Sequence, residues 1–465
     1  MLKTTLKSFY RRSSYYWSQI ASYSECVPLP DPGGVKVSTL SNGVRVATEE
    51  TASPLACVSL FIEAGPRYET ACNNGICHFI EHMAFKGFNS VRKCDFENTL
   101  LVMGAKATAE THREMQVFSV QCPCECACNF VEMLSMVITE PEFNPNEIEM
   151  EHGNIGLEMN DTENDPKAVL FDYLHAAAFQ GTPLGQRVIG PTCNVCKFDK
   201  ATALAFLREQ YQPYKIVLAT SGNVMHDQIV CFAEGRIGSL PCDPCFASED
   251  GPCRFTGSEV LYRDDSMPLA HIAIALEVPG YGSDEYLTML VMSHMLGSWH
   301  RNQGGGECNA NPIARALAAS GWCQSYQAFY IPYRDVGLWG IYFVGDRMHL
   351  DDMVFTIQNE WMKLSTMASP ADVMRGLTLA RLEVAKRYDG SVRSSYDIGT
   401  QMMYLGERRA YDTLNDRLCA VKVHTIKAAA DKYLYDRCPA VAGVGPTESL
   451  PEYNRMRAGM YWLRI

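Results

Sequence analysis

The alternation of hydrophobic and polar positions predicts a β-hairpin, a buried strand and a helix near the start of the folded chain. In residues 37–46 (VSTLSNGVRV), apolar positions alternate on both sides of the Asn-Gly pair at 42–43, which is typical of a tight hairpin turn. Residues 53–65 (SPLACVSLFIEAG) are almost continuously apolar, which indicates a buried strand. A helix is expected between residues 73–75 (NNG) and 86–87 (KG), because both segments carry residues that favour helix ends.

The same pattern recurs in the second half of the chain. Residues 53–63 (SPLACVSLFIE) resemble residues 267–277 (MPLAHIAIALE) at an offset of 214 positions. Further along, Glu158 matches Glu383, so only short gaps separate the two alignments. The sequence therefore predicts two copies of one α+β domain rather than two unrelated units.

The repeat also sets the expected domain limits. The first domain is placed at residues 36–240 and the second at residues 258–465. Residues 241–257 between them are rich in proline, glycine, cysteine and acidic residues, as is typical of a linker.

One short stretch of the first domain places proton-active side chains inside an apolar run. In CHFIEHM (residues 77–83), His78 and His82 are four positions apart, and Glu81 follows His78 by three. On a helix these side chains share one face, where two imidazoles can converge on one ion. The order is the mirror image of the H-E-x-x-H zinc signature, although so short a motif also occurs by chance.

The second copy of the repeat shows that the fold does not require polar groups at these positions. Its matching residues are Met292, Met295 and Leu296, which are all apolar. This substitution argues against an interpretation of the histidines as ordinary polar groups of the core.

A catalytic zinc ion needs a third protein ligand and one open position for water. Residues 146–161 (NEIEMEHGNIGLEMND) offer Glu151 and Glu158, which are seven positions apart and therefore share one helical face. Either carboxylate is a candidate ligand, and the other would then support the site from behind. An acidic, solvated helix is the alternative interpretation of this segment.

Composition narrows the choice of partners. The net charge is −12 and the pI is near 5.5, which argues against nucleic acid and is compatible with a cationic substrate or partner. No apolar run approaches the ~18 residues that indicate a membrane span, so we expect membrane association only through partners.

The 19 cysteines are scattered through expected strands and helices, which indicates reduced thiols. Four of them alternate in residues 122–128 (CPCECAC), where an extended segment would place all four sulfurs on one face. Because no second Cys/His cluster completes a zinc pattern, we interpret them as small, partly buried residues rather than ligands.

The first 24 residues differ from the remainder. They contain four basic residues and no acidic one, and the basic positions follow a helical spacing in a serine-rich context. This composition predicts a mitochondrial transit peptide at residues 1–24, and a disordered basic tail is the alternative.

The motif in its wider context resembles the pitrilysin/insulysin-type (M16) zinc peptidases. The resemblance rests on CHFIEHMAFKG, on the 76 positions between His82 and Glu158, and on four further stretches. These stretches are residues 171–192, 263–277, 335–344 and 439–446. The similarity is greatest to the branch that contains the β subunits of mitochondrial processing peptidase and the homologous core 1 subunits of the cytochrome bc1 complex.

This resemblance implies a fold, a site and partners. The fold would be two α/β-sandwich-like repeats, each a mixed, mainly antiparallel sheet packed by helices, which form a bowl-shaped subunit. His78, His82 and Glu158 would bind Zn²⁺, Glu81 would act as general base, and Glu151 would support the site. The implied partners are an α-type M16 subunit, cytochrome bc1 subunits and cationic presequence peptides, on the matrix side of the mitochondrial inner membrane.

The resemblance also leaves alternatives open. The chain would be an active presequence peptidase subunit, a catalytically silent structural core subunit of the bc1 complex, or a stand-alone oligopeptidase. In the edge strand that receives substrate in the family, Thr108 and Glu110 replace the usual Asn and Tyr. Of the two acids that bind the substrate arginine in the family, only Asp172 is present, because Ala168 occupies the other position.

Overall fold

The computed structural model describes residues 34–242 and 253–462. The predicted transit peptide and most of the predicted linker lie outside these described residues. Within them, no helix combines the length and apolar character that crossing a membrane requires.

The first domain is built on a six-stranded mixed sheet. Its strands are β1 (Lys36–Thr39), β2 (Arg45–Glu50), β3 (Leu55–Ile62), β4 (Lys106–Thr111), β5 (Gln116–Pro123) and β6 (Ile216–Gly222). They lie in the order β1-β2-β6-β3-β5-β4, and only β2 and β6 are parallel. The predicted hairpin is confirmed as the antiparallel pair β1–β2, and the predicted buried strand is the interior strand β3.

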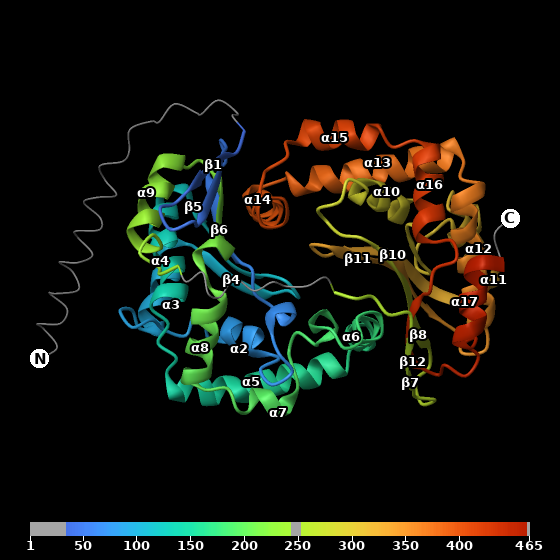
Figure 1. Ribbon diagram of the computed structural model, residues 1–465, viewed down its shortest axis with the longest axis horizontal. Coiled ribbons are helices and arrows are strands. Elements are labelled where there is room, and N and C mark those ends of the chain that lie inside the picture. Colours follow the sequence, from blue (N-terminus) through green and yellow to red (C-terminus); the bar gives the residue numbers. More distant parts are fainter. Residues whose placement is uncertain (1–33, 243–252, 463–465) are drawn as a thin grey trace, which may run out of the picture.

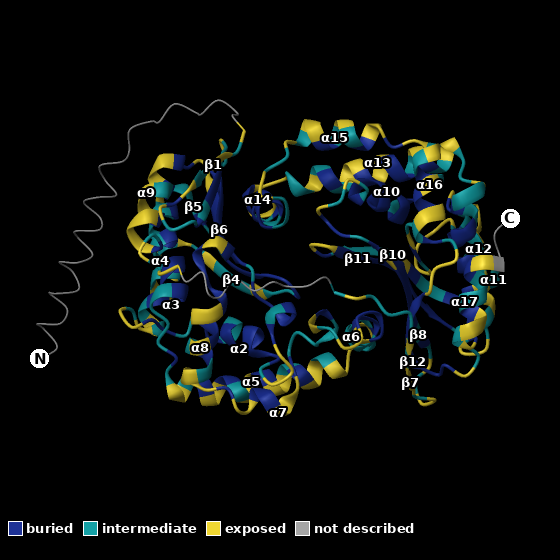
Figure 2. Cartoon of the chain, viewed as in Figure 1, coloured by how far each residue is buried: buried dark blue, intermediate teal, exposed yellow. Residues whose placement is uncertain are grey.

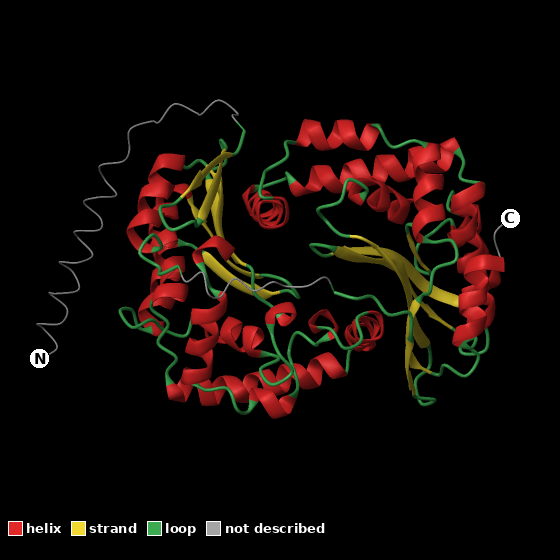
Figure 3. Cartoon of the chain, viewed as in Figure 1, coloured by secondary structure: helices red, strands yellow, loops and turns green. Residues whose placement is uncertain are grey.

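Helices cover one face of this sheet and enclose the first hydrophobic core (Figure 3). They are α2 (Ile76–Met83), α3 (Lys93–Met103), α4 (Ala127–Thr139), α5 (Pro145–Glu163), α7 (Thr192–Val195), α8 (Lys200–Gln210) and α9 (His226–Arg236). The cysteine run does not continue the extended alternation, because β5 ends at Pro123 and a 3₁₀ turn covers Cys124–Cys126. Cys122 is buried and the other three cysteines are partly buried against this core, in agreement with a packing role.

The second domain repeats the plan. Its sheet has the order β7-β12-β8-β11-β10-β9, and only β7 and β12 are parallel. These strands are β7 (Glu259–Arg263), β8 (Ala270–Pro279), β9 (Ser298–His300), β10 (Cys323–Pro332), β11 (Val336–Gly345) and β12 (Ala440–Gly445). The helices are α10 (Tyr286–Leu296), α11 (Pro312–Ser320), α12 (Leu350–Thr366), α13 (Pro370–Arg387), α15 (Tyr411–Cys419), α16 (Val423–Tyr433) and α17 (Tyr453–Trp462).

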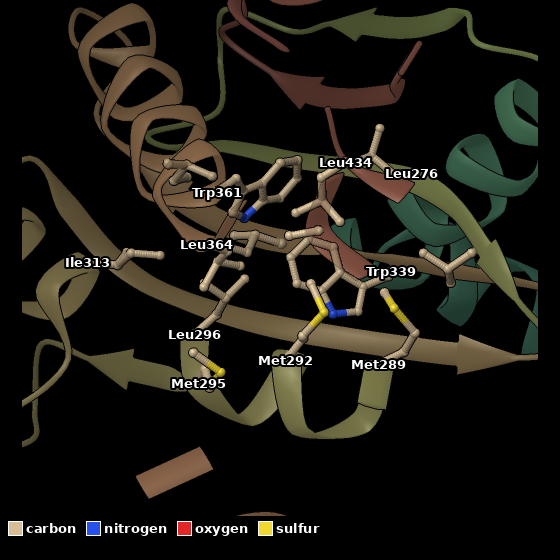
Figure 4. Packing of buried hydrophobic residues seen from close by; sticks show 14 of the residues in the cluster. Leu276, Met289, Met292, Met295, Leu296, Ile313, Trp339, Trp361, Leu364 and Leu434 are labelled. Atoms are coloured by element: carbon tan, nitrogen blue, oxygen red, sulfur yellow. The ribbon is translucent and has the colours of Figure 1, made fainter. Parts of the chain in front are cut away.

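The core of the second domain is entirely apolar where the first carries its histidine motif. Figure 4 shows Trp339 and Trp361 together in this core, with Met292 and Leu296 of α10 close by. The two indole rings have their centroids 5.3 Å apart, and all four side chains are buried.

Each domain lends one helix to the other. Helix α6 (Pro166–Ala178) belongs to the first domain in sequence but buries Leu170 and Leu174 against the second sheet. Helix α14 (Ser391–Leu405) of the second domain in turn buries Ile398 and Met402 against the first sheet. Both helices lie between the two sheets, with their inward faces buried (Figures 1 and 2). The predicted α+β chain of two related domains is therefore confirmed.

Candidate metal centre

Helix α2, which carries the histidine motif, begins after Gly75 as predicted, and the carboxylate that caps its first turn comes from outside the predicted segment. The N-cap residue is Gly75, with φ of 98° and no side-chain hydrogen bond of its own. Instead, the buried Glu69 carboxylate accepts hydrogen bonds from the backbone N–H groups of Gly75 (2.8 Å) and Cys77 (2.9 Å). The helix ends at Met83, before the expected segment at 86–87. The predicted helix is present and its predicted start at Gly75 is confirmed, but it ends earlier than predicted. A remote carboxylate satisfies its first turn.

A second buried contact holds the same turn of α2 against the sheet. The Gln116 side chain on β5 donates a hydrogen bond to the Cys77 carbonyl (2.7 Å), and Gln116 is completely buried. Sequence reasoning missed Glu69 and Gln116, and neither lies in a recognisable motif. They fix the position of the residue that precedes His78.

Three side chains from α2 and α5 meet in one small cluster. His78 Nε2 lies 3.2 Å from His82 Nε2, and Glu158 Oε2 lies 3.3 Å and 2.9 Å from these two atoms. The structure thus brings together the three residues that were predicted to bind metal. Within the described part of the chain, this is the one group of three or more possible ligand atoms close enough to share an ion.

The size of this triangle fits a zinc ion. Zinc binds nitrogen and carboxylate oxygen at about 2.0–2.1 Å, so two ligands of a regular tetrahedron lie about 3.3–3.4 Å apart. The three observed edges are 3.2, 3.3 and 2.9 Å, so the donors already span approximately one face of such a tetrahedron. The side chain of His78 is 7% exposed, whereas that of Glu158 is 43% exposed, so the cluster opens toward solvent on the side of α5.

The electrostatics of the cluster also favour a bound cation. Burial disfavours a charged His78, but hydrogen bonds to Glu158 and Glu81 outweigh burial and raise the pKa of His78 to about 9. The same histidines lower the pKa of Glu158 well below its usual range. Without a metal, a proton on His78 therefore balances the Glu158 carboxylate. A divalent cation can supply that positive charge instead.

Glu81 and Glu151 flank the triangle in different ways. Glu81 Oε2 lies 3.3 Å from His78 Nδ1, and the Glu81 side chain is 20% exposed. Glu151 is buried, and its carboxylate contacts His82 Nδ1 (3.0 Å) and Lys86 Nζ (2.6 Å). Burial opposes ionisation of Glu151, but Lys86 and His82 lower its pKa. The Glu151 carboxylate thereby favours the His82 tautomer that carries its proton on Nδ1 and leaves Nε2 free as a ligand.

The three residues predicted to bind substrate lie on two elements, Thr108 and Glu110 on β4 and Asp172 on α6. Both carboxylate oxygens of Asp172 already have partners within the chain, Arg113 Nη2 at 2.7 Å and Arg187 Nε at 3.2 Å. Thr108 shares a hydrogen bond with Ser119 (2.7 Å) on the adjacent strand. Glu110 is more than half exposed on β4 and lies 3.5 Å from His112. Strand β4 pairs only with β5 and is the last strand of its sheet, so its outer edge is available for an extended peptide.

Family models identify the class of protein to which this site belongs. The model described as Insulinase (Peptidase family M16) matches residues 45–192, and the model described as Peptidase M16 inactive domain matches residues 197–378. The first match contains the whole metal cluster. The chain belongs to the M16 peptidase family, and the family resemblance seen in the sequence is confirmed.

Two kinds of relative are similar to this chain to nearly the same degree. Human "Cytochrome b-c1 complex subunit 1, mitochondrial" is 39% identical over 92% of this chain and 90% of the relative. Human "Mitochondrial-processing peptidase subunit beta" is 37% identical over 92% of this chain and 88% of the relative. A chain of the solved "Complex III2 from Candida albicans, Inz-5 bound" aligns with a TM-score of 0.82 and 27% identity, covering 92% of this chain and all of that one. Overall similarity therefore does not separate a peptidase from a respiratory core subunit.

Proposed function

We propose that this chain is a zinc metalloendopeptidase subunit of the mitochondrial processing peptidase β type, which removes N-terminal presequences together with an α-type M16 subunit. The observation that carries the proposal is the His78–His82–Glu158 triangle, which has zinc-like dimensions and lies beside the carboxylate of Glu81. A chain with a purely structural role would gain nothing from the ionisable side chains of His78, Glu81 and His82 in positions that the second domain fills with apolar ones.

The residues of the site divide the catalytic work. His78, His82 and Glu158 would hold Zn²⁺, which when bound polarises a peptide carbonyl and makes water more acidic. Glu81 takes the proton from the attacking water and delivers it to the leaving amine as the peptide bond breaks. Glu151 keeps His82 oriented, and Lys86 keeps Glu151 ionised. Backbone groups of β4 hold the substrate as an added strand.

The proposed substrates are cationic presequence peptides. Glu110 offers an exposed carboxylate on the edge strand, and Thr108 lies two positions earlier on the same strand. Asp172 is a weaker candidate for a substrate contact than the family resemblance implies, because Arg113 and Arg187 already neutralise it. Recognition of a substrate arginine would therefore depend more on Glu110 than on Asp172.

The second candidate function is a structural one in the mitochondrial cytochrome bc1 complex. It is favoured by the relative named for subunit 1 of that complex and by the match to a complex III chain. In this role the chain would lie on the matrix side of the inner membrane and contact the membrane only through partners. The two roles are compatible, and we favour a subunit that serves both.

A cleavage assay on the natively purified complex tests the proposal. The unmodified complex should bind one zinc ion per chain and cleave a presequence peptide, whereas Glu81→Gln should keep the zinc and lose cleavage. Zinc binding without cleavage by the unmodified complex would leave only the structural role. Native mass separates the assemblies, because a heterodimer of two such chains is about twice the 51.9 kDa of this one and a bc1 assembly is several times larger.

A further inference from the structure

The second domain contains a cavity of about 710 Å³ between α10, α13, α14 and β10. Glu383, which matches Glu158 in the repeat, lies on its wall. Met115 of the first domain also lines it, so the cavity faces the space between the two domains. Its volume is within the range of sites that hold small organic ligands or the end of a peptide.

Three cationic side chains line this cavity together with two carboxylates, and these residues are Lys386, Arg387, Arg393, Glu383 and Asp397. Arg387 donates a hydrogen bond from Nη1 to the Tyr286 hydroxyl (3.0 Å), and within the described residues the guanidinium forms no ion pair. Lys386 also lines the cavity, and no described carboxylate pairs with it. Asp397, which also lines the cavity and acts electrostatically on Arg387, is bound by Arg408 and Gln401. The lining thus carries one more cation than carboxylate, and one of its two carboxylates is already bound by Arg408, in a chain whose net charge is −12.

A row of tyrosine rings forms the apolar wall. The ring centroids of Tyr404 and Tyr281 are 5.3 Å apart, those of Tyr281 and Tyr286 are 4.5 Å apart, and those of Tyr286 and Tyr330 are 5.7 Å apart. Such spacings are typical of favourable aromatic contacts, and the row offers a surface on which an aromatic or aliphatic side chain can pack.

The cavity adjoins the edge strand of the first domain. Tyr396, which lines the cavity, shares a hydrogen bond of 2.8 Å with Nε2 of His112, the residue that directly follows β4. Met115 lies three positions further on. A peptide that pairs with the free edge of β4 and continues past His112 therefore reaches this cavity.

We propose that the cavity binds the C-terminal carboxylate of a peptide whose last residue is apolar. A guanidinium pairs with a planar carboxylate through two parallel hydrogen bonds, and the tyrosine row accommodates the terminal side chain. Glu383 can accept a basic side chain further upstream in the same peptide. The assignment of a peptide rests on the proposed function, and it identifies cleaved products, which carry new C-termini, as the ligands of this cavity.

Binding can be measured without turnover. The complex that carries Glu81→Gln is titrated calorimetrically with N-acetyl-Ala-Arg-Ala-Phe, with the C-terminal amide of the same peptide, and with 3-phenylpropionate. The free-acid peptide should bind about tenfold or more tightly than its amide, because a charged hydrogen-bonded pair is lost in the amide. Equal binding of acid and amide would overturn the proposal, and equal binding of peptide and 3-phenylpropionate would overturn its assignment to peptides.

Variants of α13 locate the site. Arg387→Gln should weaken binding of the free-acid peptide by about tenfold and leave binding of the amide unchanged. Arg381→Gln is the matched control, because Arg381 is exposed on the same helix and does not line the cavity. If Arg387→Gln does not fold, the exposed pair Lys386→Gln/Arg393→Gln should still weaken binding about threefold.

Unchanged affinity in either folded variant would contradict the assignment of the carboxylate to this cavity. The proposed function fails separately, through absence of presequence cleavage by the unmodified complex. A complex that binds the peptide but cleaves nothing would refute the peptidase and retain the cavity.

Discussion

Two helix pairs occupy matching places in the two repeats, α2–α5 in the first domain and α10–α13 in the second. The first pair encloses ionisable side chains, whereas the second pair packs through apolar ones. In the first pair, His78 and His82 face Glu158 and Glu151. In the second, the residues that match the histidine motif are Met292, Met295 and Leu296, all buried. The same backbone arrangement therefore supports either a metal cluster or an apolar contact.

The partner helices differ at one position in a way that explains this contrast. At the offset that aligns Glu158 with Glu383, Glu151 aligns with Gly376. A Cβ at Gly376 would lie only 2.4 Å from Met295 Cγ and 3.0 Å from the Val291 carbonyl oxygen. Helix α13 can therefore approach α10 closely, whereas in the first domain the Glu151 carboxylate fills the corresponding space and contacts His82 and Lys86.

The difference between the two helix pairs indicates that the fold does not require the metal cluster. A buried cluster of ionisable groups is seldom more stable than apolar residues of similar volume, because the charges lose their hydration. The second domain of the same chain has apolar side chains at the matching positions. The presence of ionisable side chains at these positions in the first domain therefore argues for a chemical rather than a structural role.

The largest expected effect comes from replacing residues of the metal cluster with apolar residues like those at the matching positions of the second domain. His78→Met/His82→Leu/Glu151→Ala replaces the two imidazoles and their buried partner with apolar groups. Zinc binding and peptide cleavage should both be abolished, because only Glu158 of the ligand set remains. In chelator-treated samples, the free energy of unfolding should equal or exceed that of the metal-free parent, because buried charges are removed.

The interpretation that the cluster does not stabilise the fold would be wrong if the triple variant were less stable than the metal-free parent by several kcal/mol. That result would assign the cluster a structural role. His82→Leu alone is the informative control, because it leaves Glu151 buried without its histidine partner and should be the less stable of the two variants.

A smaller effect is expected from Glu151→Gln, which keeps the size of the side chain and removes its charge. An amide holds the His82 imidazole less firmly than a carboxylate does, so zinc affinity should fall by about 10- to 100-fold. Competition with a chromogenic chelator measures the change. Glu147→Gln on the same helix is the control, because Glu147 pairs with Lys93 outside the cluster and should leave zinc affinity unchanged.

The parts of this structure that sequence predicts well are those that depend on neighbouring residues. The β1–β2 hairpin follows from its Asn-Gly turn, and Gly43 has the positive φ of 101° that such turns need. The histidine pair is visible because helical geometry alone places positions four apart on one face. Glu158 and Glu151 share a helical face for the same reason, although only the family resemblance distinguished ligand from support.

Features that depend on distant segments were not predictable in this way. The cap of α2 comes from Glu69, and the carboxylate of Asp172 is occupied by Arg113 and Arg187. The exchange of α6 and α14 between the domains is equally hidden, because an apolar helix face does not specify which sheet will cover it. In each case the deciding partner is set by the tertiary fold.

The finest test of the comparison is a pair of glycine substitutions. Gly376→Ala adds a methyl group against Met295 and Val291, which should cost about 1–3 kcal/mol of unfolding free energy, less the roughly 1 kcal/mol by which alanine favours a helix. Gly156→Ala, on α5 of the first domain, meets nothing within 4 Å and should stabilise by up to about 1 kcal/mol. Denaturant unfolding of both variants measures the difference. If both variants gained stability, α13 would not pack on α10 as closely as described. Gly376 would then no longer explain why one helix pair holds a metal cluster and the other an apolar contact.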